Sequence, residues 1–171
     1  VVLVLDASNS MNEYSNGVTK ISALKTAARS FIDSLSSRSK ESEISVIWYH
    51  GSEEGKYNPD DLTSVTDFTQ LSDKGADSLK KGISEYSGIN GGTPMGAALQ
   101  KARTQLGEAH RDNKKYIVFM TDGLPGYWSG DYSEYYGYDS KNCQVANNAV
   151  NNASAIKDEK DGNAVIYTVG V

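Results

Sequence analysis

The sequence predicts an α/β fold, in which a doubly wound and mostly parallel central sheet is flanked by helices. Short apolar runs of strand length alternate along the chain with longer segments whose apolar residues recur at helical spacing. The first run, residues 1–5, is apolar throughout, which is typical of a parallel strand buried on both faces. With 171 residues the chain is too short for two ordinary domains, so we expect one domain over residues 1–171.

The first part of the chain predicts a strand, a helix and a second strand in a right-handed βαβ unit. Thr19 can cap the helix, whose apolar face consists of Ile21, Leu24, Ala28, Phe31, Ile32 and Leu35. The second strand is expected over residues 44–49. Residues 51–75 are polar, and we expect loops there around a weak edge strand near residues 62–68.

The remainder of the chain continues the alternation. The pattern predicts helices over 75–86, 94–109 and 145–156, and strands over 116–120 and 164–169. Gly88 and the pair Gly91-Gly92 end the first of these helices, and Pro94 is a favourable first residue for the second. Because the chain begins and ends within strand-like runs, we expect a domain excised from a longer protein.

Composition excludes several classes of protein. The net charge of -5 argues against a nucleic-acid surface, which is normally basic. A single cysteine, Cys143, excludes an internal disulfide framework and a cysteine-based zinc site. We expect Cys143 to be a buried free thiol, with a disulfide to a cysteine outside this fragment as the alternative. No run approaches the ~20 apolar residues of a membrane span.

Three short polar segments carry the chemistry of the sequence. Asp6-Ala7-Ser8-Asn9-Ser10 follows the first strand, Gly91-Gly92-Thr93-Pro94 precedes a helix, and Thr121-Asp122-Gly123 follows the strand over 116–120. Each alone is common as a turn or a helix cap. Together they offer two carboxylates and three hydroxyls at the sheet edge where open α/β sheets bind ligands. Hard oxygen ligands without a histidine or cysteine set suit a Mg²⁺-like ion, so we expect a divalent metal site.

These segments resemble the metal-ion-dependent adhesion site of von Willebrand factor A domains. The five positions of that pattern are matched by Asp6, Ser8, Ser10, Thr93 and Asp122. Asn9 replaces a glycine often found between the two serines, at a position that is not a ligand. The resemblance covers essentially the whole chain, to a last strand that ends at residues 167–171.

The resemblance implies a Rossmann-like fold and a defined role for each residue. Ser8, Ser10 and Thr93 would coordinate the ion directly, while Asp6 and Asp122 would act directly or through water. The ion would be Mg²⁺, with Mn²⁺ or Ca²⁺ as alternatives, and its open position would attract a Glu or Asp carboxylate from a partner protein. A helix usually follows the last strand in this family, and we expect this chain to lack it.

The loop after Asp122 is rich in aromatic residues interspersed with glycine, serine and acids. Such residues are enriched in binding loops, because their rings supply contact area at low entropic cost. The candidate ligand-binding residues are Tyr127, Trp128, Tyr132, Tyr135, Tyr136 and Tyr138. The alternative is a packed loop whose rings mainly hold the loop itself together.

Enzymatic interpretations have weaker support. A hydrolase with Ser8 or Ser10 as nucleophile needs a base, and the sequence offers only His50 and His110, with no third orienting group evident. The segment at residues 91–94 lacks the lysine of a phosphate-binding loop. A metal-assisted phosphatase would need a nucleophilic aspartate or a lysine clamp near the metal, and the sequence shows neither. We therefore expect no enzymatic activity.

The predicted function is metal-dependent adhesion, in which the bound ion engages an acidic group of a host or matrix protein. The pattern is most similar to that of bacterial surface and pilus-associated adhesins, so we expect an extracellular domain, at a cell surface, on a pilus or secreted, with flanking domains in a larger protein. The alternative from another class is an intracellular assembly module of an ATPase or chelatase-type complex. A Mg²⁺-dependent hydrolase is the least favoured interpretation.

Overall fold

A computed structural model describes residues 1–51, 63–108, 113–123, 126, 140–158 and 163–171, with only the backbone over 140–145. Its sheet has the strand order β5-β4-β1-β7-β8, in which β5 comprises Thr63–Val65, and β6 (Thr69–Gln70) also pairs with β4. Four strands run parallel, β1 (Val2–Asp6), β4 (Glu43–Tyr49), β7 (Lys115–Thr121) and β8 (Ala164–Gly170). The predicted α/β class with a mostly parallel sheet is thereby confirmed.

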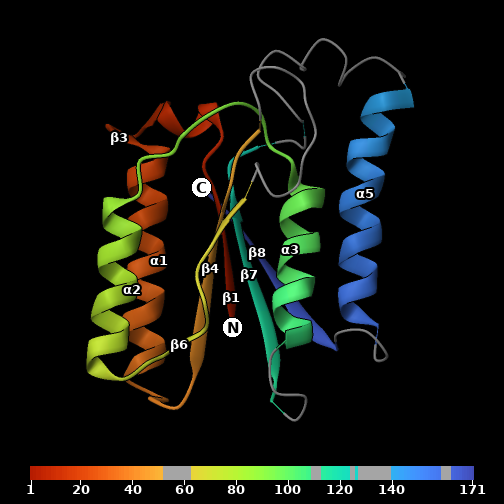
Figure 1. Ribbon diagram of the computed structural model, residues 1–171. Coiled ribbons are helices and arrows are strands. Elements are labelled where there is room, and N and C mark those ends of the chain that lie inside the picture. Colours follow the sequence, from red (N-terminus) through yellow and green to blue (C-terminus); the bar gives the residue numbers. More distant parts are fainter. Residues whose placement is uncertain (52–62, 109–112, 124–125, 127–139, 159–162) are drawn as a thin grey trace.

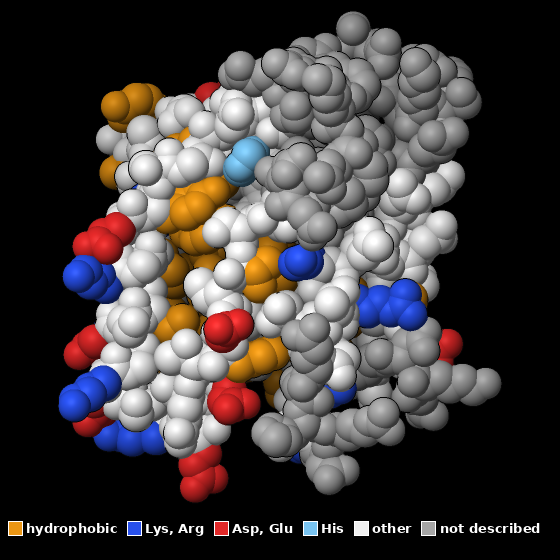
Figure 2. All heavy atoms as spheres, in the orientation of Figure 1, with side chains coloured by type: hydrophobic (Ala, Val, Ile, Leu, Met, Phe, Trp, Pro, Cys, Tyr) orange, Lys and Arg blue, Asp and Glu red, His pale blue; other side chains and the backbone are white. Residues whose placement is uncertain are grey.

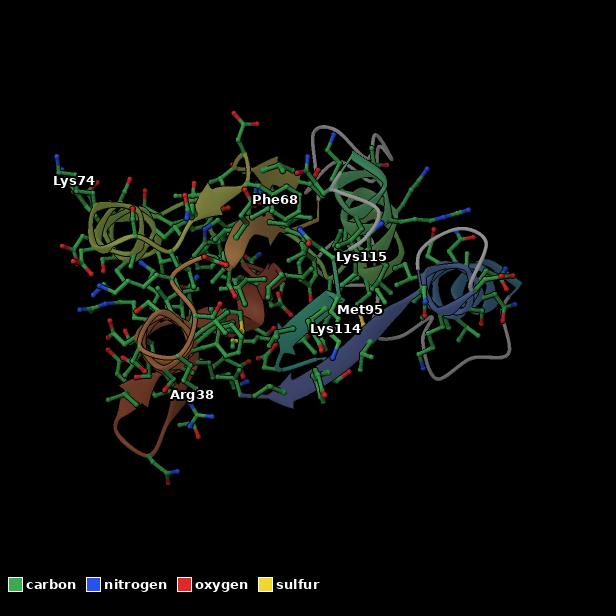
Figure 3. The ribbon with its side chains drawn as sticks, turned by 90° about the horizontal axis from the view of Figure 1, so that it is seen from below. Arg38, Phe68, Lys74, Met95, Lys114 and Lys115 are labelled. Atoms are coloured by element: carbon green, nitrogen blue, oxygen red, sulfur yellow. The ribbon has the colours of Figure 1, made fainter. Side chains whose placement is uncertain are left out.

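Helices cover both faces of the sheet (Figure 1). On one face α1 (Lys20–Ser36) packs against α2 (Asp73–Glu85), and on the other α3 (Met95–Glu108) packs against α5 (Ser140–Lys157). The view from below shows the sheet as a layer between these two helix pairs, with Lys114 and Lys115 at the end where β7 begins (Figure 3). Acidic and basic side chains are interspersed on the surface over α2 (Figure 2). Lys80 of α2 contacts Asp33 of α1 at 2.7 Å.

Two hydrophobic clusters form the core, one on each face of the sheet. Alternate residues of β1 divide between them, because successive side chains of a strand point to opposite faces. Leu3 and Leu5 pack toward α1 and α2, whereas Val2 and Val4 pack toward α3. All four are fully buried, as predicted for a parallel strand covered by helices on both sides.

The edge of the sheet beyond β4 differs in detail from the prediction. Instead of one weak strand, two short strands pair antiparallel with β4, namely β5 (Thr63–Val65) and β6 (Thr69–Gln70). The helix predicted around 145–156 begins earlier, at Ser140. Thr19 is the residue before α1 as predicted, but its hydroxyl bonds the Ser22 hydroxyl at 2.7 Å rather than a backbone N–H.

The segment between β1 and α1 contains structure that the helical and strand periodicities did not predict. A short 3₁₀ helix, η1 (Asn9–Asn12), leads into a hairpin of β2 (Tyr14–Ser15) and β3 (Val18–Thr19). Asn16 and Gly17 form the turn, with positive φ angles of 51° and 85°. An Asn-Gly pair is the usual turn for such a two-residue hairpin loop, because both positions need a left-handed backbone. The hairpin brings the start of α1 back beside the end of β1.

None of the helices within the described ranges has both the length and the apolar character that crossing a membrane requires.

Candidate metal centre

The three polar segments meet at the carboxyl ends of the parallel strands, at the upper edge of the sheet in Figure 1. Backbone hydrogen bonds fasten the first two together: Asn9 N–H donates to Gly91 C=O at 3.0 Å, and Asn90 N–H donates to Ala7 C=O at 3.0 Å. The third segment joins them through Asp122. The chain leaves β1 toward helices on one face and reaches β7 from a helix on the other, so this edge is a topological switch point.

A chain of hydroxyls connects the first segment to Asp122. Ser10 Oγ donates to Asp122 Oδ1 at 2.9 Å. Ser8 Oγ lies 3.1 Å from Ser10 Oγ, and because the Ser10 proton is used by Asp122, Ser8 is the donor of that bond. This arrangement leaves lone pairs of the Ser8 and Ser10 oxygens available to a cation.

Asp6 is completely buried and is held by neutral donors. Its Oδ1 accepts from Ser8 N–H at 2.8 Å, and its Oδ2 accepts from Tyr49 OH at 3.1 Å and from Thr121 Oγ at 2.6 Å. Burial raises the pKa of Asp6, and the hydrogen bonds from Ser8 and Thr121 oppose that rise. Burial and the nearby Asp6 carboxylate also raise the pKa of Tyr49 well above its usual value.

Asp122 is held by a cation instead. Its side chain is 1% exposed, and its Oδ2 accepts from Lys20 Nζ at 2.7 Å. The same ammonium contacts Glu13 Oε2 at 2.6 Å, on a side chain that is 66% exposed. The hydrogen bond to Asp122 and then that to Glu13 raise the pKa of Lys20. The expectation that no lysine lies near this site was therefore wrong.

Thr93 completes the cluster from the loop before α3. Its side chain is buried at 4% exposure, and no hydrogen bond joins its hydroxyl to another residue in the described part of the chain. A Cβ built on Gly123 would lie 3.8 Å from Thr93 Oγ1 and 4.0 Å from Ser10 Oγ. The two hydroxyls thus border one space that glycine leaves open. A buried hydroxyl without a partner, beside two carboxylates and two further hydroxyls, fits a hard divalent cation.

Three residues that contact the cluster were not predicted as site residues, namely Lys20, Tyr49 and Thr121. The positions of Tyr49 and Thr121 at strand ends could have revealed these two. Asp6, Tyr49 and Thr121 are the last residues of β1, β4 and β7. Asp6 is paired in register with Tyr49, and the pair Leu5 and Met120 places Thr121 in the same row. A polar residue ending each of three apolar strands is a pattern visible in the sequence. Lys20 had no such signal, because the hairpin determines where it lies.

The other candidates have separate outcomes. Asn9, at the position between the two serines that is not a ligand, is exposed at the start of η1. His50 Nδ1 lies 2.8 Å from Gly51 O, and in the described residues it has no hydrogen bond to Ser8 or Ser10. His110, the aromatic candidates over 127–138 and the side chain of Cys143 lie outside the described part of the structure.

Comparison with known proteins identifies the family of the chain. A model of the von Willebrand factor type A domain matches residues 1–124. The chain belongs to that family. A curated relative, the human collagen alpha-1(VI) chain, is 28% identical over 128 residues, which cover 71% of this chain and 12% of the relative.

Solved structures of A-domain proteins share the fold. The pilus adhesin SpaC of Lactobacillus rhamnosus GG superposes with a TM-score of 0.60 at 21% identity, over 72% of this chain and 15% of SpaC. The manganese-loaded TRAP protein of Plasmodium vivax gives a TM-score of 0.60 at 19% identity, over 99% of this chain and 56% of TRAP. This A-domain chain spans less than two thirds of the length of each of these proteins.

Proposed function

We propose that this A domain binds a divalent cation at Asp6, Ser8, Ser10, Thr93 and Asp122, and through it an acidic group of a partner protein. The observation that carries the proposal is the convergence of two buried carboxylates and three hydroxyls at one edge of the sheet. One of them, the Thr93 hydroxyl, has no hydrogen-bond partner among the residues that the structure describes. Hydroxyl and carboxylate oxygens are hard ligands, so they suit Mg²⁺ or Mn²⁺ better than they suit a soft metal. The manganese in the related TRAP structure supports this assignment.

The charge of the site favours an anionic partner. The two carboxylates carry two negative charges, and Lys20 supplies one positive charge beside Asp122. Neutral hydroxyls in contact with a divalent ion would leave its charge poorly neutralised. A carboxylate from a partner protein would balance that charge, as an electrostatic contact that also selects the partner.

The surroundings in which the domain would act follow from its relatives. A pilus adhesin and a collagen chain both support binding to proteins outside the cell. We infer an extracellular or cell-surface protein, in which this domain is one of several, with a host or matrix protein as ligand. The ligand-contact role of Tyr127, Trp128, Tyr132, Tyr135, Tyr136 and Tyr138 stays a prediction.

Thermal unfolding with and without metal tests the metal centre. A ligand that binds only the native state stabilises it by about 2.7 kcal/mol at a concentration of 100 Kd. We expect Mn²⁺ or Mg²⁺ to raise Tm relative to EDTA, and Thr93→Val to remove most of that increment while preserving the shape of the side chain. Asp122→Ala should abolish it.

Thr104→Val is the matched control, since it removes an exposed hydroxyl of α3 that bonds the backbone of Gln100 at 3.2 Å. Its metal-induced rise in Tm should equal that of the wild type. Identical unfolding curves of the wild type in saturating metal and in EDTA would contradict the proposed function.

A further inference from the structure

We propose that Lys20 is an internal cation that competes with the metal for Asp122 and so sets the metal affinity of the site. The proposal deepens the proposed function, since it rests on a cation binding at this cluster. It concerns a residue that the five-position pattern does not contain. The observation behind it is the 2.7 Å contact between Lys20 Nζ and Asp122 Oδ2, made to a carboxylate that is almost completely buried.

Burial makes this ion pair different from the other lysine pairs of the described chain. Lys40 and Asp73 also lie 2.8 Å apart, but their side chains are 64% and 86% exposed, so water and salt screen them. Lys20 is only 20% exposed and Asp122 only 1% exposed, so their attraction is screened far less. A divalent ion approaching Asp122 therefore meets a carboxylate whose charge is already neutralised, and it is also repelled by the ammonium.

The hairpin holds the ammonium in this position. Lys20 N–H donates to Glu13 C=O at 2.9 Å, and Lys20 Nζ contacts Glu13 Oε2 at 2.6 Å, so both ends of the lysine are tied to one residue. Glu13 is exposed, whereas Asp122 is almost completely buried. Glu13 gives Lys20 a second carboxylate, with which the ammonium can remain paired when a metal binds Asp122. Metal binding then exchanges one cation at Asp122 for another and frees Lys20 for Glu13 or for the partner's acidic group.

Substitution of Lys20 gives this proposal two readouts that move in opposite directions. Lys20→Met removes the charge and keeps most of the apolar stem. Because neither the attraction between Lys20 and Asp122 nor the repulsion between the ammonium and the ion then opposes binding, we expect Mn²⁺ to bind ~10-fold tighter, which corresponds to about 1.4 kcal/mol. The same variant should be less stable than the wild type in EDTA, since Asp122 then lacks its cation, and the difference should shrink in saturating Mn²⁺.

Three further variants separate charge from structure. Lys20→Arg keeps the charge and should stay within about threefold of the wild-type affinity, whereas Glu13→Gln removes a negative charge near the site and should weaken Mn²⁺ binding. Lys40→Met removes the same charge as Lys20→Met, from an exposed pair at the other end of the sheet, and should leave Mn²⁺ affinity unchanged. If Lys20 only supported the fold, its substitution by methionine would lower stability without increasing the affinity for Mn²⁺.

Isothermal titration with Mn²⁺ and unfolding in EDTA decide between the outcomes. The competition is supported if Lys20→Met binds Mn²⁺ more tightly than the wild type while Lys20→Arg and Lys40→Met do not. It is also supported if Lys20→Met is the one variant that binds Mn²⁺ measurably. Equal affinity of wild type and Lys20→Met overturns the role of Lys20 and leaves the metal centre standing. If neither protein binds Mn²⁺, both the competition and the proposed function are rejected.

Discussion

The two carboxylates of the proposed metal centre lie at the ends of neighbouring strands, yet they are held in opposite ways. Asp6 is fixed by neutral donors from three directions, the Ser8 N–H, the Tyr49 hydroxyl and the Thr121 hydroxyl. Asp122 is held by the Ser10 hydroxyl and by the ammonium of Lys20. The difference leads us to propose a division of labour, in which Asp6 belongs to the core and Asp122 would be the exchangeable ligand of the metal.

The tyrosine that donates to Asp6 is more deeply buried than the lysine that contacts Asp122. Tyr49 is fully buried and paired in register with Asp6, so its hydroxyl has no access to water if the carboxylate is removed. The cation at Asp122 has an alternative, because Lys20 is partly exposed and already touches Glu13. Unsatisfied buried donors cost about 1–3 kcal/mol each, whereas an exposed ammonium regains its hydration.

The largest expected effect comes from removing each carboxylate in turn. In EDTA, Asp6→Ala should lower the free energy of unfolding by about 3 kcal/mol, because it leaves several buried donors without an acceptor. Asp122→Ala should cost only about 1 kcal/mol, since Lys20 keeps Glu13. Both variants should lose Mn²⁺ binding. Urea denaturation of the two variants, each against the wild type, measures the difference, and equal losses of stability would remove the proposed division of labour.

A smaller effect isolates one bond on the Asp6 side. Tyr49→Phe removes the 3.1 Å hydrogen bond to Asp6 Oδ2 and leaves the ring in the core. We expect a loss of about 1 kcal/mol in EDTA, together with at least ~10-fold weaker Mn²⁺ binding, because groups that orient metal ligands commonly change affinity by that much.

Tyr86→Phe is the control for that substitution. The Tyr86 hydroxyl donates to Gly88 C=O at 3.0 Å in an exposed bond, while its ring stacks on Trp48 with centroids 4.1 Å apart. Stability and Mn²⁺ affinity of this variant should both stay close to the wild type. A Tyr49→Phe protein that behaves like the control would show that Asp6 does not depend on the tyrosine.

The sequence predicted the parts of the fold that depend on periodicity. The apolar runs and helical spacings located the parallel strands and the four helices that the structure describes within a few residues, apart from the early start of α5. The five-position pattern also located the oxygens that the structure brings together. Both signals are local or are repeated many times, which is why they can be read without coordinates.

The contacts that distinguish Asp6 from Asp122 depend on register and on a turn. Tyr49 and Thr121 reach Asp6 because three strands end in the same row, and that alignment comes from pairing across the sheet. Lys20 reaches Asp122 from 102 positions away in sequence because the Asn16-Gly17 turn folds the chain back before α1. The Asn-Gly pair itself is a readable hairpin signal. The contact between Lys20 and Asp122 depends on tertiary structure, so it cannot be predicted from the spacing of residues in the sequence.

The smallest expected effect concerns Thr93, which neither carboxylate holds. Gly91 places it, with φ at 51° and a carbonyl that accepts from Asn9 N–H at 3.0 Å. A side chain at this left-handed position costs about 1 kcal/mol, and relief of that strain would displace the loop that carries Thr93. Gly91→Ala should therefore weaken Mn²⁺ binding several-fold while lowering stability by only about 1 kcal/mol.

Gly82→Ala provides the comparison of opposite sign for this last substitution. Gly82 lies within α2, where an added Cβ meets nothing within 4 Å, so alanine should stabilise the helix by roughly 0.5–1 kcal/mol. Mn²⁺ affinity should not change in that protein, because α2 contributes no ligand to the site. If Gly91→Ala also kept its Mn²⁺ affinity, the position of Thr93 would not matter to the metal, and the two carboxylates with the Ser8 and Ser10 hydroxyls would account for binding.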